Sequence, residues 1–565
     1  MHSQVTHQHL YNPHRSTLYI VVLTLILGAL QLAWSTEFSE ATPFLLSLGI
    51  SKRLLSLVWL AGPLSGTIGQ PIVGMLSDRC MFSYGKRRVF ILIGCIATVM
   101  SLIALSHSVE IVETLLLPFD VSKSKVNLGI ICFACLGIYV LDFSIAIIQT
   151  SSRALIVDVV PTEQQQIANA WAARMIGIFN LVGFAIGALN LKKLFPMLGD
   201  NQFKVLSLLV SLIMFSITCF CLYFIEERNP QTDLTLIAQR QAQDEALKNL
   251  GVDPRSTTIP LQLLNFFRQI YYAFKSVPLQ VKTVCYAQLF AWIGYFPLLF
   301  YTTSYVGELY LYEKGYPNPS LIPPEKKQDL LDQSTRVGTY ALLANSIVTL
   351  VLVTFIPSLL ESSNSMPLLR EKFNLRSLWI YSHMVFFICT FFTFFINSYK
   401  QAIVLFAFTG IPWGCAVWLP FALISEEISR IKDIRAIQIS NSQSTSTSSA
   451  TVIEDDAPTI NDYNVIYCKQ ILIDYYSKVE YDSGILLALH NVFVSAPQML
   501  SSFMSSILFT LFHNSKNTNT YDPSLAWVFR FGGLMALGAW FISRRVKTPS
   551  QLYSKDKLMA IESGF

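Results

Sequence analysis

Apolar runs of about 20 residues recur along the whole chain, and they constrain the fold more than any other feature of the sequence. Each run is long enough to cross the hydrocarbon core of a bilayer as one helix. The chain is 52% hydrophobic and only 14% charged, which is too apolar for a soluble globular protein. We therefore predict an all-α polytopic membrane protein with twelve transmembrane helices. They are expected near residues 17–48, 54–76, 89–109, 128–158, 167–190, 204–225, 281–310, 337–359, 377–397, 401–425, 484–511 and 524–543.

Charge and cysteine usage exclude several function classes. The formal net charge of +5 is small and the basic residues gather at the predicted membrane edges, so a nucleic-acid partner is not indicated. The 10 cysteines lie mostly singly in apolar runs without metal-binding spacings, which indicates buried small hydrophobic residues and no metal site. No Walker-type phosphate loop and no nucleophile–base arrangement is visible, so we expect neither an enzyme nor a cofactor.

Two long polar segments interrupt the series of predicted helices. The first separates six helices from six, and the second contains NSQSTSTSSATVIEDDAPT, a polar run typical of disorder. Residues 437–460 of that run are a candidate target for kinases. The predicted organisation is a tail (1–16), a six-helix bundle (17–225), a central loop (226–280), a second six-helix bundle (281–543, with a Ser/Thr-rich loop at 429–483) and a tail (544–565).

Basic residues predict which side the loops occupy. The loop after the second predicted helix, SDRCMFSYGKRR, is strongly basic, and the positive-inside rule assigns it to the cytoplasm. With an even number of crossings, both termini and both long polar segments are then cytoplasmic. Lys52/Arg53 and Lys192/Lys193 lie on the opposite side and go against the rule.

The fourth predicted helix carries polar residues in an apolar wall. Asp142, Gln149 and Arg153 are seven and eleven residues apart, so they lie within about 20° of one another on a helix. Asp142 and Arg153 are separated by roughly 16 Å along the axis. An ionised group at mid-membrane costs at least about 2.5–3.5 kcal/mol and is tolerated beside water or a partner. The stripe indicates either a structural ion pair or a proton-coupled path for a solute.

The first predicted helix holds two acids that need an explanation. Trp34, Glu37 and Glu40 recur at a spacing of three, which places them on one helical face, and neighbouring carboxylates favour proton binding. They are candidates for contact with a proton or a sugar, or for a role at the outer membrane boundary. Sugar rings can also stack on tryptophan, although tryptophan is common at membrane interfaces. The tryptophans considered are Trp34, Trp59, Trp292, Trp413 and Trp418.

The second predicted helix ends in a motif that indicates a structural and gating role. The motif joins Gly74-x-x-x-Asp78-Arg79 to Gly85-Lys86-Arg87-Arg88. The glycines of GTIGQPIVGMLSDRC, the stretch that ends in this motif, allow neighbouring helices to approach closely. Asp78 can pair with basic groups or a helix N-terminus at the cytoplasmic face. His383 and His490 are expected to be satisfied histidines of the helix core.

The GxxxDR…GKRR loop resembles the signature of the major facilitator superfamily. More specifically, the chain resembles the sucrose-transporter branch of the glycoside–cation symporters, and the inserts at 226–280 and 429–483 suggest a fungal-type member. The segments that carry this resemblance are LVWLAGPLSGTIGQPIVGMLSDRC (58–80), YVLD (139–142), SSRALIVD (151–158), IANAWAARMIGIFNLVGFAIGA (167–188), AWIGYFPLLFYTTSYVGELY (291–310), FTGIPWGCAVWLPFALIS (408–425) and NVFVSAPQML (491–500).

The resemblance implies roles for matching positions. Asp142 corresponds to the family's proton site, and Arg153 to an arginine needed for transport. Trp292 and Asn491 lie in shared segments and are further candidates for sugar contact.

The chain also departs from plant members of the family. It has Lys52 in place of their histidine and Thr302–Ser304 in place of an acidic segment, which leaves Glu308 as the nearby acid. Plant members have Gln and Leu where Glu37 and Glu40 stand.

These observations predict a symporter that imports sucrose, maltose or related α-glucosides together with a proton by alternating access between the two halves. The proton is then the coupling ion, and a small sugar and the bilayer are the partners. Two alternatives remain at this point. One is a proton-coupled monosaccharide carrier, and the other is a sugar sensor that does not transport. The plasma membrane is the expected location, with the vacuole or another internal membrane as the alternative.

Overall fold

The computed structural model describes residues 14–547, with gaps at 79, 120, most of 234–276, 365–373, 428–482 and 514–520. All the regular elements in the described residues are helical. The Ser/Thr-rich run at 437–460 and most of the central loop lie outside the described residues.

The helices form two groups, which we call the first and second halves. The first half comprises α2 (Thr17–Thr36), η1 (Glu37–Ala41), α3 (Thr42–Ser47), α4 (Lys52–Val58), α5 (Ala61–Leu64), η2 (Ser65–Gly69), α6 (Gln70–Asp78), α7 (Arg88–Ser106), α8 (Ser108–Leu116), α9 (Lys123–Val159), α10 (Gln165–Ala188), α11 (Leu191–Leu194) and α12 (Gln202–Phe224). The second half comprises α15 (Leu279–Glu313), α16 (Pro324–Asn364), α18 (Leu375–Phe392), α19 (Tyr399–Phe408), α22 (Ser483–Phe512) and α23 (Ser524–Ser543).

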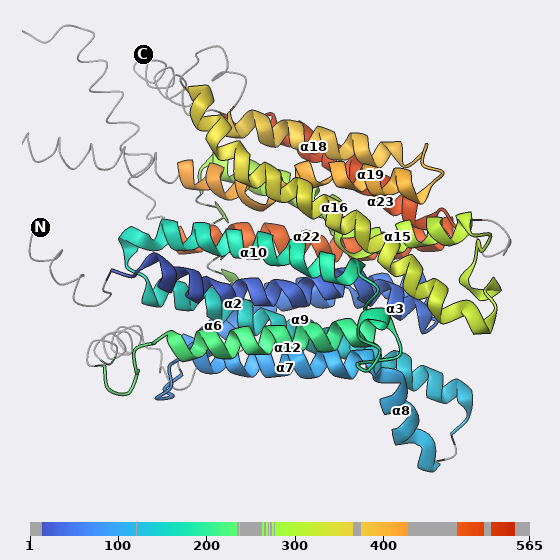
Figure 1. The fold of residues 1–565 in the computed structure, drawn as a ribbon. Helices are drawn as coiled ribbons and strands as arrows, with labels where there is room; N and C mark the ends of the chain where they lie inside the picture. The colour runs from blue at the N-terminus through green and yellow to red at the C-terminus, as the bar shows by residue number, and fades with distance from the viewer. Residues whose placement is uncertain are drawn as a thin grey trace, which may run out of the picture.

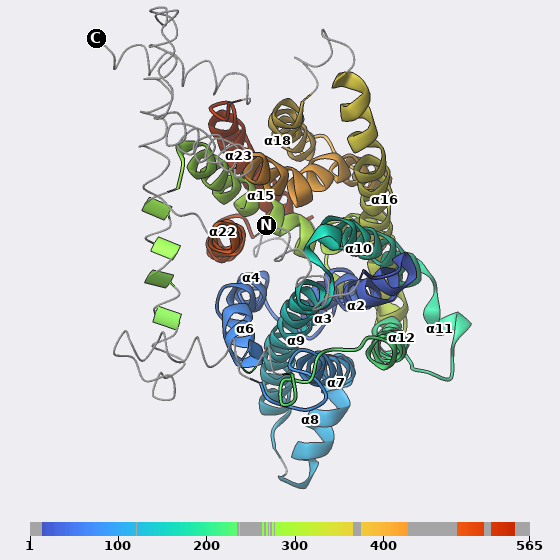
Figure 2. The ribbon, with the colours of Figure 1, turned by 90° about the vertical axis from the view of Figure 1, so that its left-hand side faces the viewer.

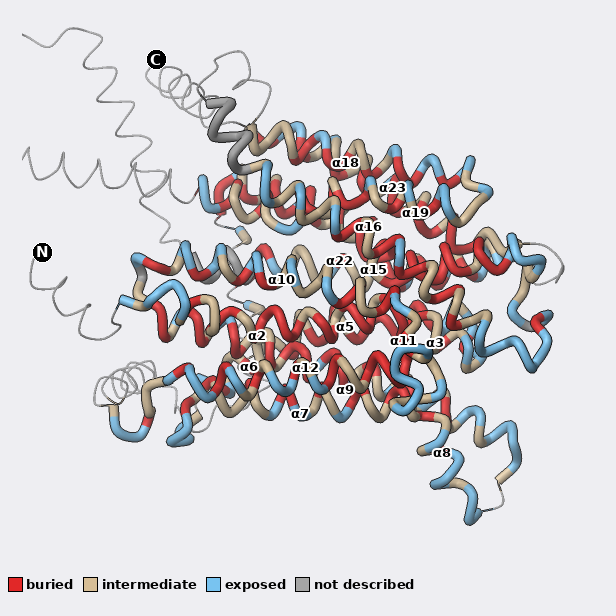
Figure 3. The backbone as a smooth tube through the Cα atoms, viewed as in Figure 1, coloured by how far each residue is buried: buried red, intermediate tan, exposed pale blue. Residues whose placement is uncertain are grey.

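The two halves lie side by side with their long helices roughly aligned (Figure 1), and the end-on view separates them clearly (Figure 2). Contacts between α10 and α16, and between α22 and α4, join the halves. Buried backbone gathers where the halves meet, whereas the loops and α8 are exposed (Figure 3). Outward-facing apolar side chains such as Met100 and Leu136 are exposed on the bundle surface, as lipid contact requires.

Local side-chain hydrogen bonds explain where several helices begin. The Ser16 hydroxyl accepts from the Tyr19 N–H at the start of α2, and the Ser51 hydroxyl accepts from the Leu54 N–H at the start of α4. Inside the helices, hydroxyls donate to the carbonyl one turn earlier, as Thr24 Oγ1 does to Ile20 O at 2.9 Å. Such bonds allow polar side chains in an apolar surrounding.

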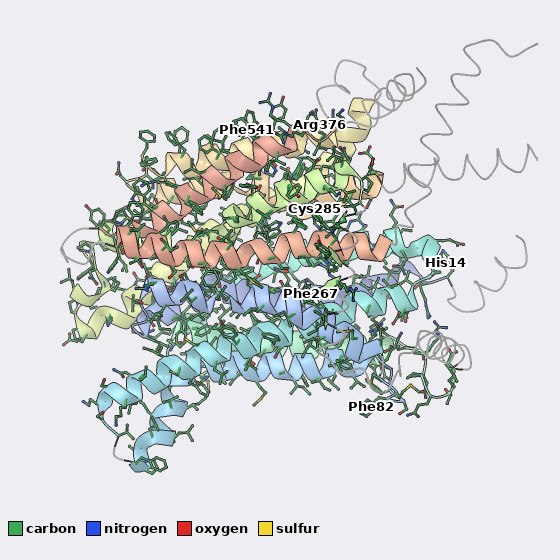
Figure 4. All side chains as sticks on the ribbon, turned by 180° about the vertical axis from the view of Figure 1, so that it is seen from behind. His14, Phe82, Phe267, Cys285, Arg376 and Phe541 are labelled. Atoms are coloured by element: carbon green, nitrogen blue, oxygen red, sulfur yellow. The ribbon has the colours of Figure 1, made fainter. Side chains whose placement is uncertain are left out.

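Both ends of the described chain lie at the same end of the bundle. Arg376 and Gln280, at the starts of α18 and α15, bond to backbone atoms of residues 544–547. His14, Phe82 and Arg376 all lie toward one end in Figure 4. We call it the Arg87 end, after a residue that lies there, and we call the other the Lys52 end.

Eleven helices among the described residues are long and apolar enough to cross a membrane. They match eleven of the predicted spans and confirm an all-α membrane protein. The twelfth prediction, 54–76, falls on the short consecutive elements α4, α5, η2 and α6. Because a turn at Trp59 and Leu60 interrupts this stretch, it does not form one long helix, and the twelfth crossing stays a prediction.

Candidate functional site

Asp142 lies in the middle of α9 and is fully buried. Neither of its carboxyl oxygens has a hydrogen-bond partner among the described residues. The adjoining wall comes from α5, where a Cβ at Gly62 would lie 3.7 Å from Asp142 Oδ1. Asp142 is therefore an unpaired acid, and the missing side chain at Gly62 leaves space beside its carboxyl group.

The face of α9 that begins at Asp142 becomes steadily more open toward the Arg87 end. Asp142 is buried, Gln149 is half-buried and Arg153 is exposed. Arg153 makes no ion pair in the described part of the chain, so it does not neutralise Asp142. An ion pair locking the helices is therefore not what this conformation contains. The arrangement instead offers a polar route from a buried acid to an exposed cation.

Glu37 and Glu40 do not share a face as the three-residue spacing predicted. They lie in the π-helical turn η1, whose i→i+5 hydrogen bonds change the angle between neighbouring residues. The charge of Glu37 interacts with Asp142 of α9, whereas that of Glu40 interacts with Asp332 and Arg336 of α16. The prediction of one shared acidic face was wrong because the helix is not regular there.

Aromatic rings surround the turn that carries these acids. Trp34 stacks on Phe38 with centroids 5.3 Å apart, and Phe38 meets Phe300 of α15 edge-on at 5.1 Å. Trp59 packs on the same Phe300 at 4.3 Å, and its buried indole N–H has no partner in the described residues. Phe38 and Phe300 were not singled out in the sequence, because no spacing relates them across the two halves.

The remaining candidates for sugar contact lie on the second half. Trp292 of α15 is half-buried and packs edge-on against Trp413, with centroids 5.7 Å apart, and its buried N–H has no partner in the described chain. Asn491 lies on α22 and is exposed. The two histidines are buried as expected: His383 bonds to the Tyr295 hydroxyl, and His490 to the Gln288 amide.

Three charged side chains join the halves at the Lys52 end. Lys52 Nζ lies 2.7 Å from Glu308 Oε1 and 3.0 Å from Asp522 Oδ2, so one lysine of the first half holds two acids of the second. Glu308, a candidate for sugar contact, is therefore engaged by Lys52 in this conformation. Asp522 was missed in the sequence, because a pairing between residues so far apart leaves no local pattern.

The position of Asp522 has a clear electrostatic consequence. Partial burial raises the pKa of its carboxyl, but Lys52 and a hydrogen bond from His513 outweigh that effect. The net result lowers the pKa from 3.8 to about 2. The pair between Asp522 and Lys52 is therefore charged throughout the physiological pH range.

The basic motif at the Arg87 end forms a second group of ion pairs. Arg87 pairs with Asp78, as the sequence predicted for that acid, and its Nε donates to Asp158 Oδ2 at 3.0 Å. Lys86 Nζ lies 3.1 Å from the same Asp158 oxygen. These contacts tie α6, the start of α7 and the end of α9 together. Arg79 lies outside the described residues.

A half-buried acid after α12 completes this group. Glu227 accepts hydrogen bonds from the backbone N–H groups of Lys86, Arg87 and Arg88 at 3.0–3.1 Å. Gly85 turns the chain with a φ of +120°, a conformation that other residues rarely adopt. Arg88 stacks on Tyr84, 3.9 Å from its ring centroid.

The close approach expected at the glycines of GTIGQPIVGMLSDRC is found at Gly66 and Gly69 and not at Gly74. Gly74 does not mediate a close approach, because nothing lies within 4 Å of where its Cβ would be. The close approaches of this segment lie one and two turns earlier. A Cβ at Gly66 would meet Ser495 Oγ at 3.0 Å, and one at Gly69 would meet the Phe143 ring at 3.2 Å.

The chain resembles known proteins both in sequence and in fold. The model of the Major Facilitator Superfamily matches residues 16–437. The chain belongs to this superfamily. A general alpha-glucoside permease of Schizosaccharomyces pombe is 28% identical to the chain, with 94% of both chains covered. A sucrose transport protein of Oryza sativa subsp. japonica, SUT1, is 26% identical, with 72% of this chain and 75% of the relative covered.

Solved structures of superfamily members share the fold. The xylose transporter XylE from E. coli superposes with a TM-score of 0.52 at 12% identity, covering 95% of this chain and 99% of the other. A proton-dependent oligopeptide transporter superposes with a TM-score of 0.55 at 10% identity, covering 94% and 98%. The resemblance stated from the sequence is thus confirmed, and the fold places the protein in a membrane with many crossings.

Proposed function

We propose that this superfamily member is a proton-coupled sugar symporter that carries sucrose, maltose or related α-glucosides into the cell. The observation that carries the proposal is the unpaired Asp142 at the buried end of a face that opens through Gln149 to Arg153. A buried carboxyl without a partner is stable as the neutral acid and costly as the anion, so its protonation is tied to the conformation around it. The names of the two relatives support the choice of substrate.

In the proposed cycle, protonated Asp142 makes the interior neutral, and a sugar binds between the halves. Half-buried indole rings such as Trp34 and Trp292 offer apolar faces to the C–H surface of the sugar, and the N–H of Trp292, which has no partner among the described residues, can donate to its hydroxyls. The halves then rock about this site, and the proton leaves toward Arg153. Carrying one charge through 100 mV supplies about 2.3 kcal/mol, or roughly fifty-fold accumulation.

The orientation of the protein follows from its charges. The Arg87 end carries the basic loop and both ends of the described chain, so we assign it to the cytoplasm. The exceptions noted in the sequence support this assignment, because Lys52 and Lys192 are each paired with acids at the Lys52 end. The expected site of action is the plasma membrane, with the Lys52 end outside.

The experiment that tests this function is uptake of labelled sucrose, maltose and glucose in a transport-deficient yeast, with external pH recorded at the same time. A symporter for α-glucosides accumulates the disaccharides and makes the medium more alkaline during uptake. Uptake of glucose alone would favour a monosaccharide carrier, and normal surface expression without uptake of any sugar would favour a sensor. Imaging of the tagged chain distinguishes the plasma membrane from the vacuole.

A further inference from the structure

Two buried acids lie on neighbouring elements of the first half, since α2, which leads directly into η1, packs against α9. Glu37 of the π-helical turn η1 is 1% exposed, Asp142 of α9 is fully buried, and their charges interact. All four carboxyl oxygens lack a hydrogen-bond partner among the described residues. Structural acids in a core are normally satisfied by donors or cations, so a pair with no donor is an exception that requires a reason.

We propose that Glu37 is a second proton-binding residue of the coupling site and forms a buried carboxyl pair with Asp142. The inference rests on the assignment of Asp142 as the coupling residue. Two carboxyl groups in a dry interior cannot both be charged at moderate cost, so in this conformation the pair retains at least one proton. The pair therefore holds its last proton more tightly than either acid would alone.

The groups around the pair leave it without a compensating cation. On α9, Tyr139 lies one turn from Asp142, and its hydroxyl interacts electrostatically with the Asp142 carboxyl. On α5, a Cβ at Gly62 would lie 3.7 Å from Asp142 Oδ1, so the Gly62 backbone faces this acid. Arg153 is the next cation on that face, and it is roughly 16 Å away along the axis.

Two helices of the second half, α15 and α16, also pack on η1. Thr303 of α15 donates through Oγ1 to Phe38 O at 3.4 Å, which anchors the turn. The charged residues of α16, Asp332 and Arg336, interact with Glu40. The turn thus directs one acid to the interior of the first half and the other to the second half. A regular helix would not divide them in this way, since it brings residues three apart onto one face.

The test compares the pH dependence of sugar uptake in Glu37→Gln and the wild type, with Glu40→Gln as the matched control. The control removes an acid from the same turn that interacts with α16 and not with Asp142. In the wild type, repulsion between the two carboxylates makes the pair hold its last proton, whereas Glu37→Gln leaves Asp142 as a single acid without that repulsion, so the loss of uptake at alkaline pH should begin about one unit lower in Glu37→Gln. Glu37→Asp, which keeps the acid, should shift less than Glu37→Gln, and Glu40→Gln should keep the wild-type onset of the alkaline loss, whatever its rate of uptake.

Surface amount and melting temperature of each variant are measured to separate coupling from folding. A well-expressed Glu37→Gln protein with the wild-type pH profile would overturn the inference, and so would an equal shift in Glu40→Gln. If Glu37→Gln does not reach the surface, Glu37→Asp decides: a small shift in the same direction supports the inference, because a shorter acid alters the pair interaction, and a profile identical to the wild type overturns it. Failure of the proposed function is seen separately, as intact proton coupling in Asp142→Asn.

Discussion

Glu37 and Asp142 are both buried where α2 and the η1 turn that follows it pack near α9, and neither carboxyl group has a hydrogen-bond partner among the described residues. Asp142 faces the broken stretch that contains Gly62 and η2, and Glu37 lies in the irregular turn η1. Irregular turns of this kind are frequent at functional sites, because they reposition side chains that a regular helix would direct elsewhere. The site is therefore built where two helices depart from regular geometry.

Lys52→Met should weaken the contact between the two halves at the Lys52 end. The change leaves Glu308 and Asp522 without their shared cation, so we expect the apparent melting temperature of the purified protein to fall by several degrees. Lys192→Met is the matched control, because its pair with Asp329 also joins the halves but is well exposed, and its loss should change little. Equal melting temperatures of Lys52→Met and the wild type would contradict this assignment.

Proton coupling should survive in Lys52→Ala, since Lys52 contacts acids at one end of the bundle and not Asp142. Sugar affinity or preference can still change, because Glu308 is released. The measurement is alkalinisation during uptake, normalised to protein at the cell surface. Uptake without any proton movement in this variant would place Lys52 in the coupling machinery.

The pair between Asp522 and Lys52 should not respond to pH near neutrality. The pKa of Asp522 in the folded protein is about 2, below its ordinary 3.8, so its contribution is fully present above about pH 4 and is lost as the pH falls toward 2. The contribution is on the order of 2 kcal/mol. The difference in melting temperature between the wild type and Asp522→Asn should be constant from pH 5 to 8 and smaller at pH 3.5. A difference that changes between pH 5 and 7 would show that another group controls this contact.

Glu227→Ala should destabilise the Arg87 end. The substitution removes an acceptor from three backbone N–H groups at the start of α7, a loss on the order of 2 kcal/mol. Glu226→Ala is the control, because that side chain is exposed. Thermal unfolding of both variants in detergent measures the effect, and equal stability of the two would contradict the capping role of Glu227.

Much of the fold and part of the site could be predicted from the sequence. Apolar run length located eleven crossing helices, because a bilayer imposes a minimum length on each. Helical phase located Asp142, Gln149 and Arg153 on one face, because α9 is regular there. The same reasoning failed for Glu37 and Glu40, where a π turn replaces the regular helix.

Pairings across the halves were beyond the reach of any local pattern. The link from Lys52 to Asp522 and the packing of Trp59 on Phe300 depend on how the halves meet. The role of the Ser/Thr-rich run stays a prediction, since residues 437–460 lie outside the described residues.

Sugar-dependent proton uptake by purified Asp142→Asn in liposomes tests the central claim most directly. Asparagine keeps the volume and much of the hydrogen bonding of the protonated acid but cannot exchange a proton. The account predicts that sugar binding survives, while sugar-driven proton uptake and accumulation against a gradient are lost. Proton uptake at the wild-type rate in Asp142→Asn would contradict the mechanism.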